Sequence, residues 1–179
     1  MIPKTKQHVT GELISESMKA LLEKKEPLFD ELQLSKASNE KLVFALCGYA
    51  LDMTDEKYSS FGFCDTETKI IFLDESFFRS KSLVKRTLLH EIAHAFQDEL
   101  SPLDKTKEWA FSELLRMEWE AESVAYHLYN KHFGTKHHRF FNNYFSVSDV
   151  INLFDYYRVE GKDGIVFDID INLLTQNLT

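Results

Sequence analysis

The stretch "TLLHEIAHAFQDEL", Thr87 to Leu100, contains the sequence pattern that is most informative about the fold of this chain. His90 and His94 are four positions apart, so on an α-helix they lie one above the other on the same face. Two imidazole nitrogens placed in this way can bind one zinc ion. Glu91 is rotated about 100° from His90 around the helix, so it lies beside the metal position instead of on it. This is the position required of a general base that takes a proton from metal-activated water. The HExxH pattern thus places two metal ligands and a base on one helix.

A catalytic zinc site also needs a third protein ligand and an open position for water. The expected source is the next helix, which contains Glu118, Glu120 and Glu122. Acidic residues at alternate positions of a helix cannot all face the same way. Glu120 has Val124 four positions later, so it is expected near the packing face and is predicted to be the third ligand. Glu118 and Glu122 are predicted to form a solvent-exposed acidic stripe.

The composition is that of a globular protein, with 44% hydrophobic and 28% charged residues in a chain of 179. The net charge of −8 repels a phosphate backbone, so a nucleic-acid partner is not expected. The sequence contains no apolar run of membrane-spanning length and no signal-like apolar segment at its start, so we expect a cytoplasmic protein without a membrane partner. The two cysteines, Cys47 and Cys64, lie in apolar stretches and are predicted to be buried free thiols.

The pattern of apolar, capping and turn residues predicts an α+β fold. We expect a single domain over residues 1–179, with a core at about 40–134 and a C-terminal helical extension at about 139–179. The predicted helices lie at 10–25, from 80 or 82 to 100 and at 108–132, with two further helical pieces at 139–145 and 146–159. Residues 42–47 are predicted to form a buried strand, with a short helix as the alternative. Hairpin strands are predicted at 61–64 and 69–73, and a last strand at 165–174.

The motif helix and the helix that follows it resemble those of a known family. "HEIAH", followed by "EWEAESVAYHLYNKHFG" at 118–134, is similar to the catalytic half of zinc metallopeptidases of the ImmA/IrrE and ArdC-like group. The string "EAESVAY", Glu120 to Tyr126, is especially similar to the ArdC type. The resemblance covers residues from Gly62 to about Gly134. It implies a gluzincin-like fold, in which a small antiparallel or mixed sheet packs on the HExxH helix and on a second, ligand-bearing helix, with its edge strand along the active-site cleft.

Residue by residue, the resemblance implies His90 and His94 as zinc ligands, Glu91 as the base and Glu120 as the third ligand. One departure is Ala93, which stands where motifs of the HELGH type carry glycine. A second departure is that the first 60 residues are neither basic nor long enough for the DNA-binding region of ArdC-type proteins. The DNA-linked role of those relatives is therefore not expected here.

The predicted function is that of a zinc metalloendopeptidase whose protein or peptide substrate lies extended along the outer strand of the hairpin, near Ile71 or Phe72. Tyr126 and His127 are candidate donors to the developing oxyanion. Asp98, four positions after His94, is a candidate acceptor that orients a histidine. Two alternatives remain open: a non-catalytic interaction module that retains the fold, and a metallohydrolase that cuts a bond other than a peptide bond.

Overall fold

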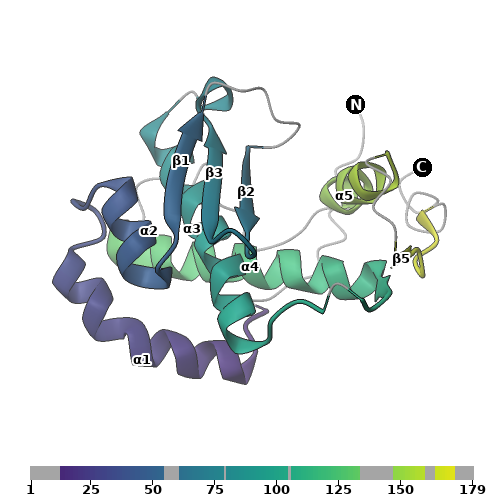
Figure 1. Ribbon diagram of the computed structural model, residues 1–179, viewed down its shortest axis with the longest axis horizontal. Helices are drawn as coiled ribbons and strands as arrows, with labels where there is room; N and C mark the ends of the chain where they lie inside the picture. The colour runs from purple at the N-terminus through teal and green to yellow at the C-terminus, as the bar shows by residue number, and fades with distance from the viewer. Residues whose placement is uncertain are drawn as a thin grey trace, which may run out of the picture.

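The structure is a computed structural model that describes residues 13–54, 61–78, 80–104, 106–133, 147–159 and 164–171. In this part of the chain, five α-helices and a small mixed sheet form the expected α+β fold (Figure 1). The elements in chain order are α1 (Glu16–Leu32), α2 (Asn39–Cys47), β1 (Ala50–Thr54), β2 (Gly62–Asp65), β3 (Ile70–Asp74), the 3-10 helix η1 (Glu75–Phe77), α3 (Lys81–Leu100), β4 (Trp109–Ala110), α4 (Phe111–Phe133), α5 (Val147–Val159) and β5 (Ile165–Val166).

The three-stranded sheet has the order β1-β3-β2, with β3 parallel to β1 and antiparallel to β2. The predicted hairpin is confirmed as β2 and β3, each within one residue of its expected bounds. Ile71 and Leu73 are fully buried, while Phe72 points to the other face and stacks on Phe63 with 6.1 Å between ring centroids. Since β3 is the central strand, the expectation that a substrate pairs at Ile71 or Phe72 is wrong. The edge strand of the hairpin is β2.

The buried strand predicted at residues 42–47 is instead the helix α2. The side-chain oxygen of Ser38 caps its start by accepting a hydrogen bond from the backbone N–H of Lys41, and Gly48 ends it with a left-handed backbone at φ 73°. Leu42 and Leu46, four positions apart, are both buried on one face. The two caps and this spacing favour the helix over the strand. The strand of this region is β1, which begins two residues after the glycine.

The first helix begins and ends later than the sequence predicts. Ser15 caps α1, and the helix continues through Pro27 to Leu32. Proline removes one backbone hydrogen bond, but contacts beyond it offset the loss. Phe29 is fully buried and its ring lies 5.7 Å from that of His132 on α4. The predicted helix start at residues 10–12 and the helical piece at 139–145 lie outside the described residues.

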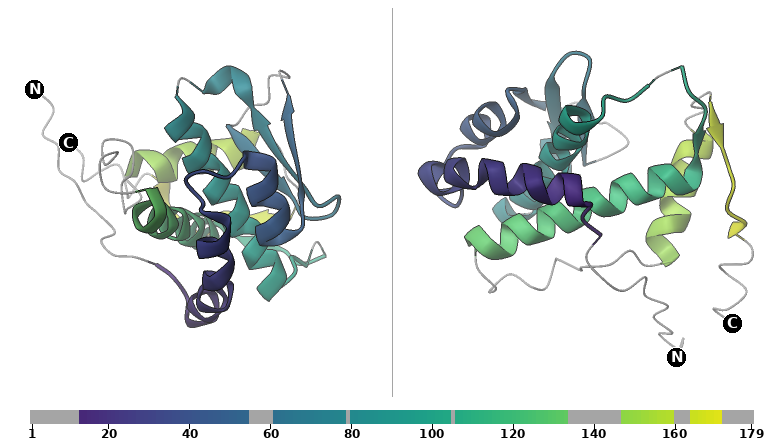
Figure 2. Two further views of the ribbon diagram at one scale, coloured as in Figure 1. Left: turned by 90° about the vertical axis from the view of Figure 1, so that its left-hand side faces the viewer. Right: turned by 90° about the horizontal axis from the view of Figure 1, so that it is seen from below.

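Helix α3 lies between the sheet and α4, with the bounds predicted for it and with Ser80 as its N-cap. Its side chains Leu88, Leu89 and Ile92 are fully buried. Helix α4 crosses α3 and also runs beside α1, which Figure 2 shows from below. An ion pair between Lys131 and Glu26, at 2.5 Å, joins α4 to α1. Helix α4 therefore has neighbours on two sides, and this arrangement determines where its glutamates point.

The C-terminal elements are held against the start of α4. Phe111 is fully buried, with Phe154 and Phe167 at centroid distances of 5.3 and 5.8 Å. Asp168 accepts a hydrogen bond from the backbone N–H of Ser112 at 2.9 Å and another from its hydroxyl group. Of the strand predicted at 165–174, residues 165–171 are described, and within them only β5 is strand; it pairs in parallel with β4. These contacts fix the position of α5 near the two long helices.

Candidate metal centre

The two histidines of the motif face each other across one turn of α3. Their rings meet edge to face with centroids 4.8 Å apart, and the two Nε2 atoms are separated by 3.1 Å. Each side chain is 18% exposed, so the pair is accessible from one side only. The four-residue spacing in the sequence therefore brings the rings together as predicted.

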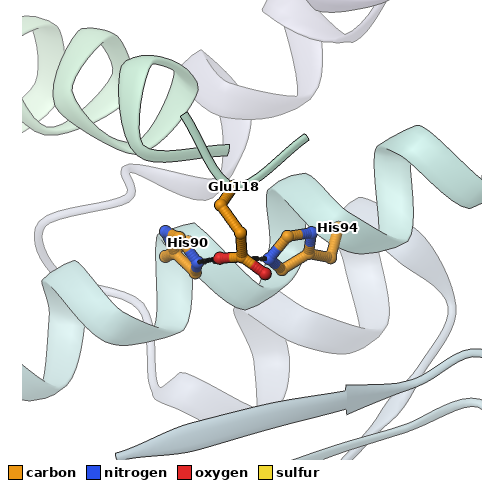
Figure 3. Close-up of side chains that lie close together, drawn as sticks. All are labelled: His90, His94 and Glu118. Carbon is orange, nitrogen blue, oxygen red and sulfur yellow. Dashed lines mark hydrogen bonds and ion pairs between the residues drawn. The ribbon is translucent and has the colours of Figure 1, made fainter. Parts of the chain in front are cut away.

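The acidic residue beside them is Glu118, which points from α4 between the two rings (Figure 3). Its Oε2 atom lies 3.2 Å from Nε2 of His90 and 3.5 Å from Nε2 of His94. Among the described residues, His90, His94 and Glu118 form the group of potential ligands that could hold a metal ion. The prediction that Glu120 completes this group does not hold in the structure.

Glu120 points instead toward α1 and the end of α3. Its Oε1 accepts a hydrogen bond from the backbone N–H of Ser15 at 2.8 Å, and its Oε2 accepts one from Nε2 of Gln97 at 3.0 Å. Glu120 would reach the histidines only if the apolar line through Val124 faced α3. Because α4 has a second neighbour in α1, two of its faces are buried, and burial of Val124 does not identify the face toward the histidines.

The Nδ1 atom of each histidine has its own acceptor. Nδ1 of His90 lies 3.2 Å from Oε2 of Glu122, whose other oxygen pairs with Arg86. Nδ1 of His94 lies 2.8 Å from Oε1 of Gln97. Glu122 is therefore not part of a solvated stripe, since its side chain is only 13% exposed. With each Nδ1 donating its hydrogen, each Nε2 is left as the metal-binding nitrogen.

The spacing of the three converging atoms fits a tetrahedral ion. Atoms bonded to one zinc ion at about 2.0–2.2 Å lie roughly 3.3–3.6 Å from one another. The three distances between Nε2 of His90, Nε2 of His94 and Oε2 of Glu118 are 3.1, 3.2 and 3.5 Å. Two imidazoles and one carboxylate are a donor set that zinc accepts in catalytic sites. The residues present therefore fit the metal that the motif predicts.

The pKa shifts in this cluster indicate that a positive charge is favoured at the position of the two histidines. Burial opposes a charged His90, but the hydrogen bonds to Glu118 and Glu122 outweigh it and raise the pKa of His90 well above its ordinary value. Burial also opposes an ionised Glu118, but the two histidines hold the pKa of that carboxyl well below its usual range. The acidic partners thus favour positive charge at this position, which a bound cation would supply.

Glu91 lies beside this group and not within it. Its residue surface is 6% exposed, and burial raises the pKa of Glu91 although both neighbouring histidines lower it. A Cβ atom at Gly62 would come within 2.9 Å of Oε1 of Glu91 and within 2.9 Å of the Leu73 side chain. A side chain at this position would have to displace Glu91, Leu73 or Thr87, so glycine lets β2 lie close to α3 without such a shift. The edge strand is thereby held next to the carboxylate that the motif predicts as the base.

A cleft of about 560 Å³ opens over the histidines and Glu91. Strand β2 forms one part of its lining and α5 another. Much of the lining is apolar or aromatic, and the residues of this kind are Phe61, Phe63, Leu83, Leu103, Leu114, Met117, Leu153, Tyr156 and Tyr157. The cleft therefore joins the candidate metal centre to the open edge of the sheet.

The remaining predicted residues have other surroundings. Tyr126 packs against the core and His127 is exposed, and neither lines the cleft. Asp98 does line it, but its carboxylate bonds to Tyr49 at 3.2 Å and to Lys69 at 2.7 Å, so the acceptor that orients His94 is Gln97.

Tyr157, which no sequence pattern indicates as a site residue, also lies at the centre, with its hydroxyl 3.5 Å from Oε1 of Glu118. Burial and the neighbouring Glu118 raise the pKa of Tyr157, so it remains a neutral hydrogen-bond donor. Its place in the cleft depends on long-range docking of α5, which no local pattern signals.

Both cysteines are free and partly buried. Burial raises the pKa of Cys47 to about 11 and also raises that of Cys64. Both are therefore protonated thiols at neutral pH, and neither belongs to the metal-binding group. The prediction of free thiols is confirmed.

Comparison with protein-family models, with curated proteins and with solved structures gives no match to this chain. Among the described residues, no helix combines the length and the apolar character needed to cross a bilayer.

Proposed function

We propose that this chain is a zinc-dependent metallopeptidase with a zincin-like packing of sheet and helices. The observation that carries the proposal is the convergence of His90, His94 and Glu118 beside the buried carboxylate of Glu91, at the base of a cleft. A zinc ion held by the three ligands would supply the positive charge that lowers the pKa of a water molecule and polarises a carbonyl group.

Glu91 has the role of general base and proton carrier. It accepts a proton from the attacking water and returns it to the amine that leaves when the peptide bond breaks. Burial raises the pKa of Glu91, which brings the carboxylate closer to the range where it can both accept and return a proton. The nearness of β2 keeps this side chain at the edge of the cleft.

The substrate is an extended peptide segment that adds to the open edge of β2. In the antiparallel ladder, the backbone N–H of Asp74 donates to the carbonyl of Phe61 at 3.2 Å. Main-chain groups alternate in direction along a strand, so those of Phe63 face β3 and those of Cys64 face away from it. The apolar lining of the cleft favours large apolar side chains next to the bond that is cut.

A non-catalytic interaction module is the second candidate, and Glu91 argues against it. Burying a carboxylate costs free energy, and an interaction module gains nothing from this one in return. A metallohydrolase that cuts a different bond would share the same ligands and base. The substrate therefore has to be identified by experiment.

The test is metal analysis of the purified chain together with cleavage of a peptide library followed by mass spectrometry. We expect about one zinc ion per chain, cleavage that stops after chelation, and recovery when zinc is added back. Zinc binding without cleavage of any peptide would favour the two alternatives. A chain that does not bind zinc would contradict the proposal.

A further inference from the structure

The amide of Gln97 lies between His94 and Glu120. It is buried, with 8% of the residue exposed, and each of its polar atoms has a partner. Nε2 of Gln97 lies 2.9 Å from the carbonyl oxygen of Met117 and 3.0 Å from Oε2 of Glu120. Oε1 of Gln97 lies 2.8 Å from Nδ1 of His94. These contacts cross from α4 to α3 and end on a histidine of the candidate metal centre.

The two acceptors on one side of Gln97 determine which way its amide points. A carbonyl and a carboxylate both require a donor, so the NH₂ group must face α4 and the oxygen must face His94. The amide oxygen can accept a hydrogen bond but cannot donate one, so its partner Nδ1 of His94 must carry the hydrogen. His94 is therefore held with its hydrogen on Nδ1, and its Nε2 faces Glu118 and His90.

Glu120 is in turn fixed at both oxygens. Its Oε1 accepts from the backbone N–H of Ser15, which is the N-cap of α1, and its Oε2 accepts from Gln97. Next to it, the backbone N–H of Leu13 donates to the hydroxyl of Ser123 at 3.1 Å. Leu13 and Ser15, just before α1, are thus docked on the same face of α4 that orients Gln97.

We propose that Glu120 and Gln97 are positioning residues that fix the orientation and the tautomer of His94, and that docking of Leu13 and Ser15 on α4 contributes to metal affinity through them. The proposal rests on the metal centre described above. The sequence predicts Glu120 as a metal ligand, whereas here it acts on the ligand His94 through the amide of Gln97.

The chain offers a set of variants that separates positioning from packing. In Glu120→Gln, the new amide has a single oxygen, so either Ser15 or Gln97 faces an NH₂ group. In Gln97→Glu, two carboxylates meet where an amide and a carboxylate stood. The double variant Gln97→Glu/Glu120→Gln exchanges the two groups. Its carboxylate accepts from His94 and from the new amide, whose oxygen accepts from Ser15, while the carbonyl of Met117 loses its donor in the double variant and in Gln97→Glu alike. Glu108→Gln, at an exposed position, is the matched control.

The first measurement follows the nitrogen chemical shifts of His94 by NMR in the metal-free chain, at alkaline pH where the imidazole is neutral. We expect hydrogen on Nδ1 in the wild type and in the double variant, and a mixture of tautomers in Glu120→Gln. This readout does not need a metal, so it remains informative if the chain fails to bind zinc. An unchanged tautomer in Glu120→Gln would overturn the proposal.

The second measurement is zinc affinity by competition with a chromophoric chelator, with thermal unfolding recorded in parallel. Loss of a partner that orients a ligand typically costs about 10–100-fold in metal affinity. We expect a loss in this range for each single variant, a smaller loss in the double variant than in Gln97→Glu, which shares its unpaired Met117 carbonyl, and no change in Glu108→Gln. A double variant that binds zinc no better than Gln97→Glu, with its melting temperature intact, would overturn positioning as the role of the pair.

Discussion

Two residues apart on α4, Glu118 and Glu120 act on the two different nitrogens of His94. Oε2 of Glu118 lies 3.5 Å from Nε2, while Glu120 reaches Nδ1 only through the amide of Gln97, which lies 2.8 Å from it. Side chains two positions apart are rotated about 200° around a helix, so one carboxylate cannot take the place of the other. The first is placed to bind a metal, and the second is placed to hold the histidine that binds it.

This difference predicts that Glu118→Ala loses zinc far more completely than Glu120→Ala. Removing Glu118 leaves two imidazoles, whereas removing Glu120 leaves all three ligands in a looser arrangement. The loss in affinity for Glu118→Ala should exceed the roughly 10–100-fold expected of a residue that acts through a ligand. Dialysis of both variants against the same low zinc concentration, followed by metal analysis, measures the difference. An empty Glu120→Ala beside a loaded Glu118→Ala would reverse the assignment.

Replacing the base should abolish cleavage and leave the metal in place. In Glu91→Gln the shape of the side chain is kept and the proton acceptor is lost, which removes a contribution of about 10²–10⁴-fold to the rate. Asp98→Asn is the matched control, because Asp98 also lines the cleft but bonds to Tyr49 and Lys69. We expect kcat near the wild-type value in the control and full zinc occupancy in both. Normal turnover in Glu91→Gln would exclude the mechanism.

The HExxH pair could be predicted because both histidines lie on one helix with fixed spacing. The third ligand could not be derived in the same way, since it depends on how α4 packs against two neighbours. One sequence signal was available: Glu118, Ala121, Glu122 and Ala125 follow the i, i+3, i+4, i+7 spacing of a single helical face. Ala121 and Ala125 are fully buried. Small residues beside acidic ones allow two helices to approach closely, and α4 approaches α3 in this way at the histidines.

If substrate adds to the edge of β2, a proline at Cys64 should weaken cleavage. Proline removes the N–H that faces away from β3, and a lost main-chain hydrogen bond of about 0.5–1.5 kcal/mol corresponds to a decrease of roughly 2- to 12-fold in kcat/KM. Cys64→Val is the control, because it removes the thiol but keeps the N–H. Zinc content and melting temperature of both variants are measured alongside. Equal kcat/KM in the two variants would show that substrate does not use this strand.

Tyr157 is expected to donate a hydrogen bond to the negative charge that develops on the substrate. Tyr157→Phe should lower kcat by roughly 10²-fold, as loss of such a donor does elsewhere, with little change in zinc affinity. Tyr156→Phe, on the same helix and in the same cleft, is the control. A fall in zinc affinity instead of kcat would assign the hydroxyl to holding Glu118, which lies 3.5 Å away.

Among the described residues, the groups within hydrogen-bonding distance of a nitrogen of either histidine come from α3 and α4, whereas β2 and α5 contribute walls of the cleft. In the proposed enzyme, the metal ligands and the base are carried by α3 and α4, whereas β2 and α5 supply the walls that a peptide would contact, apart from the hydroxyl of Tyr157. Substitutions at Phe63 or Leu153 would alter the shape offered to a peptide without touching the proposed ligands. Selectivity could therefore change during divergence while the metal centre stays constant.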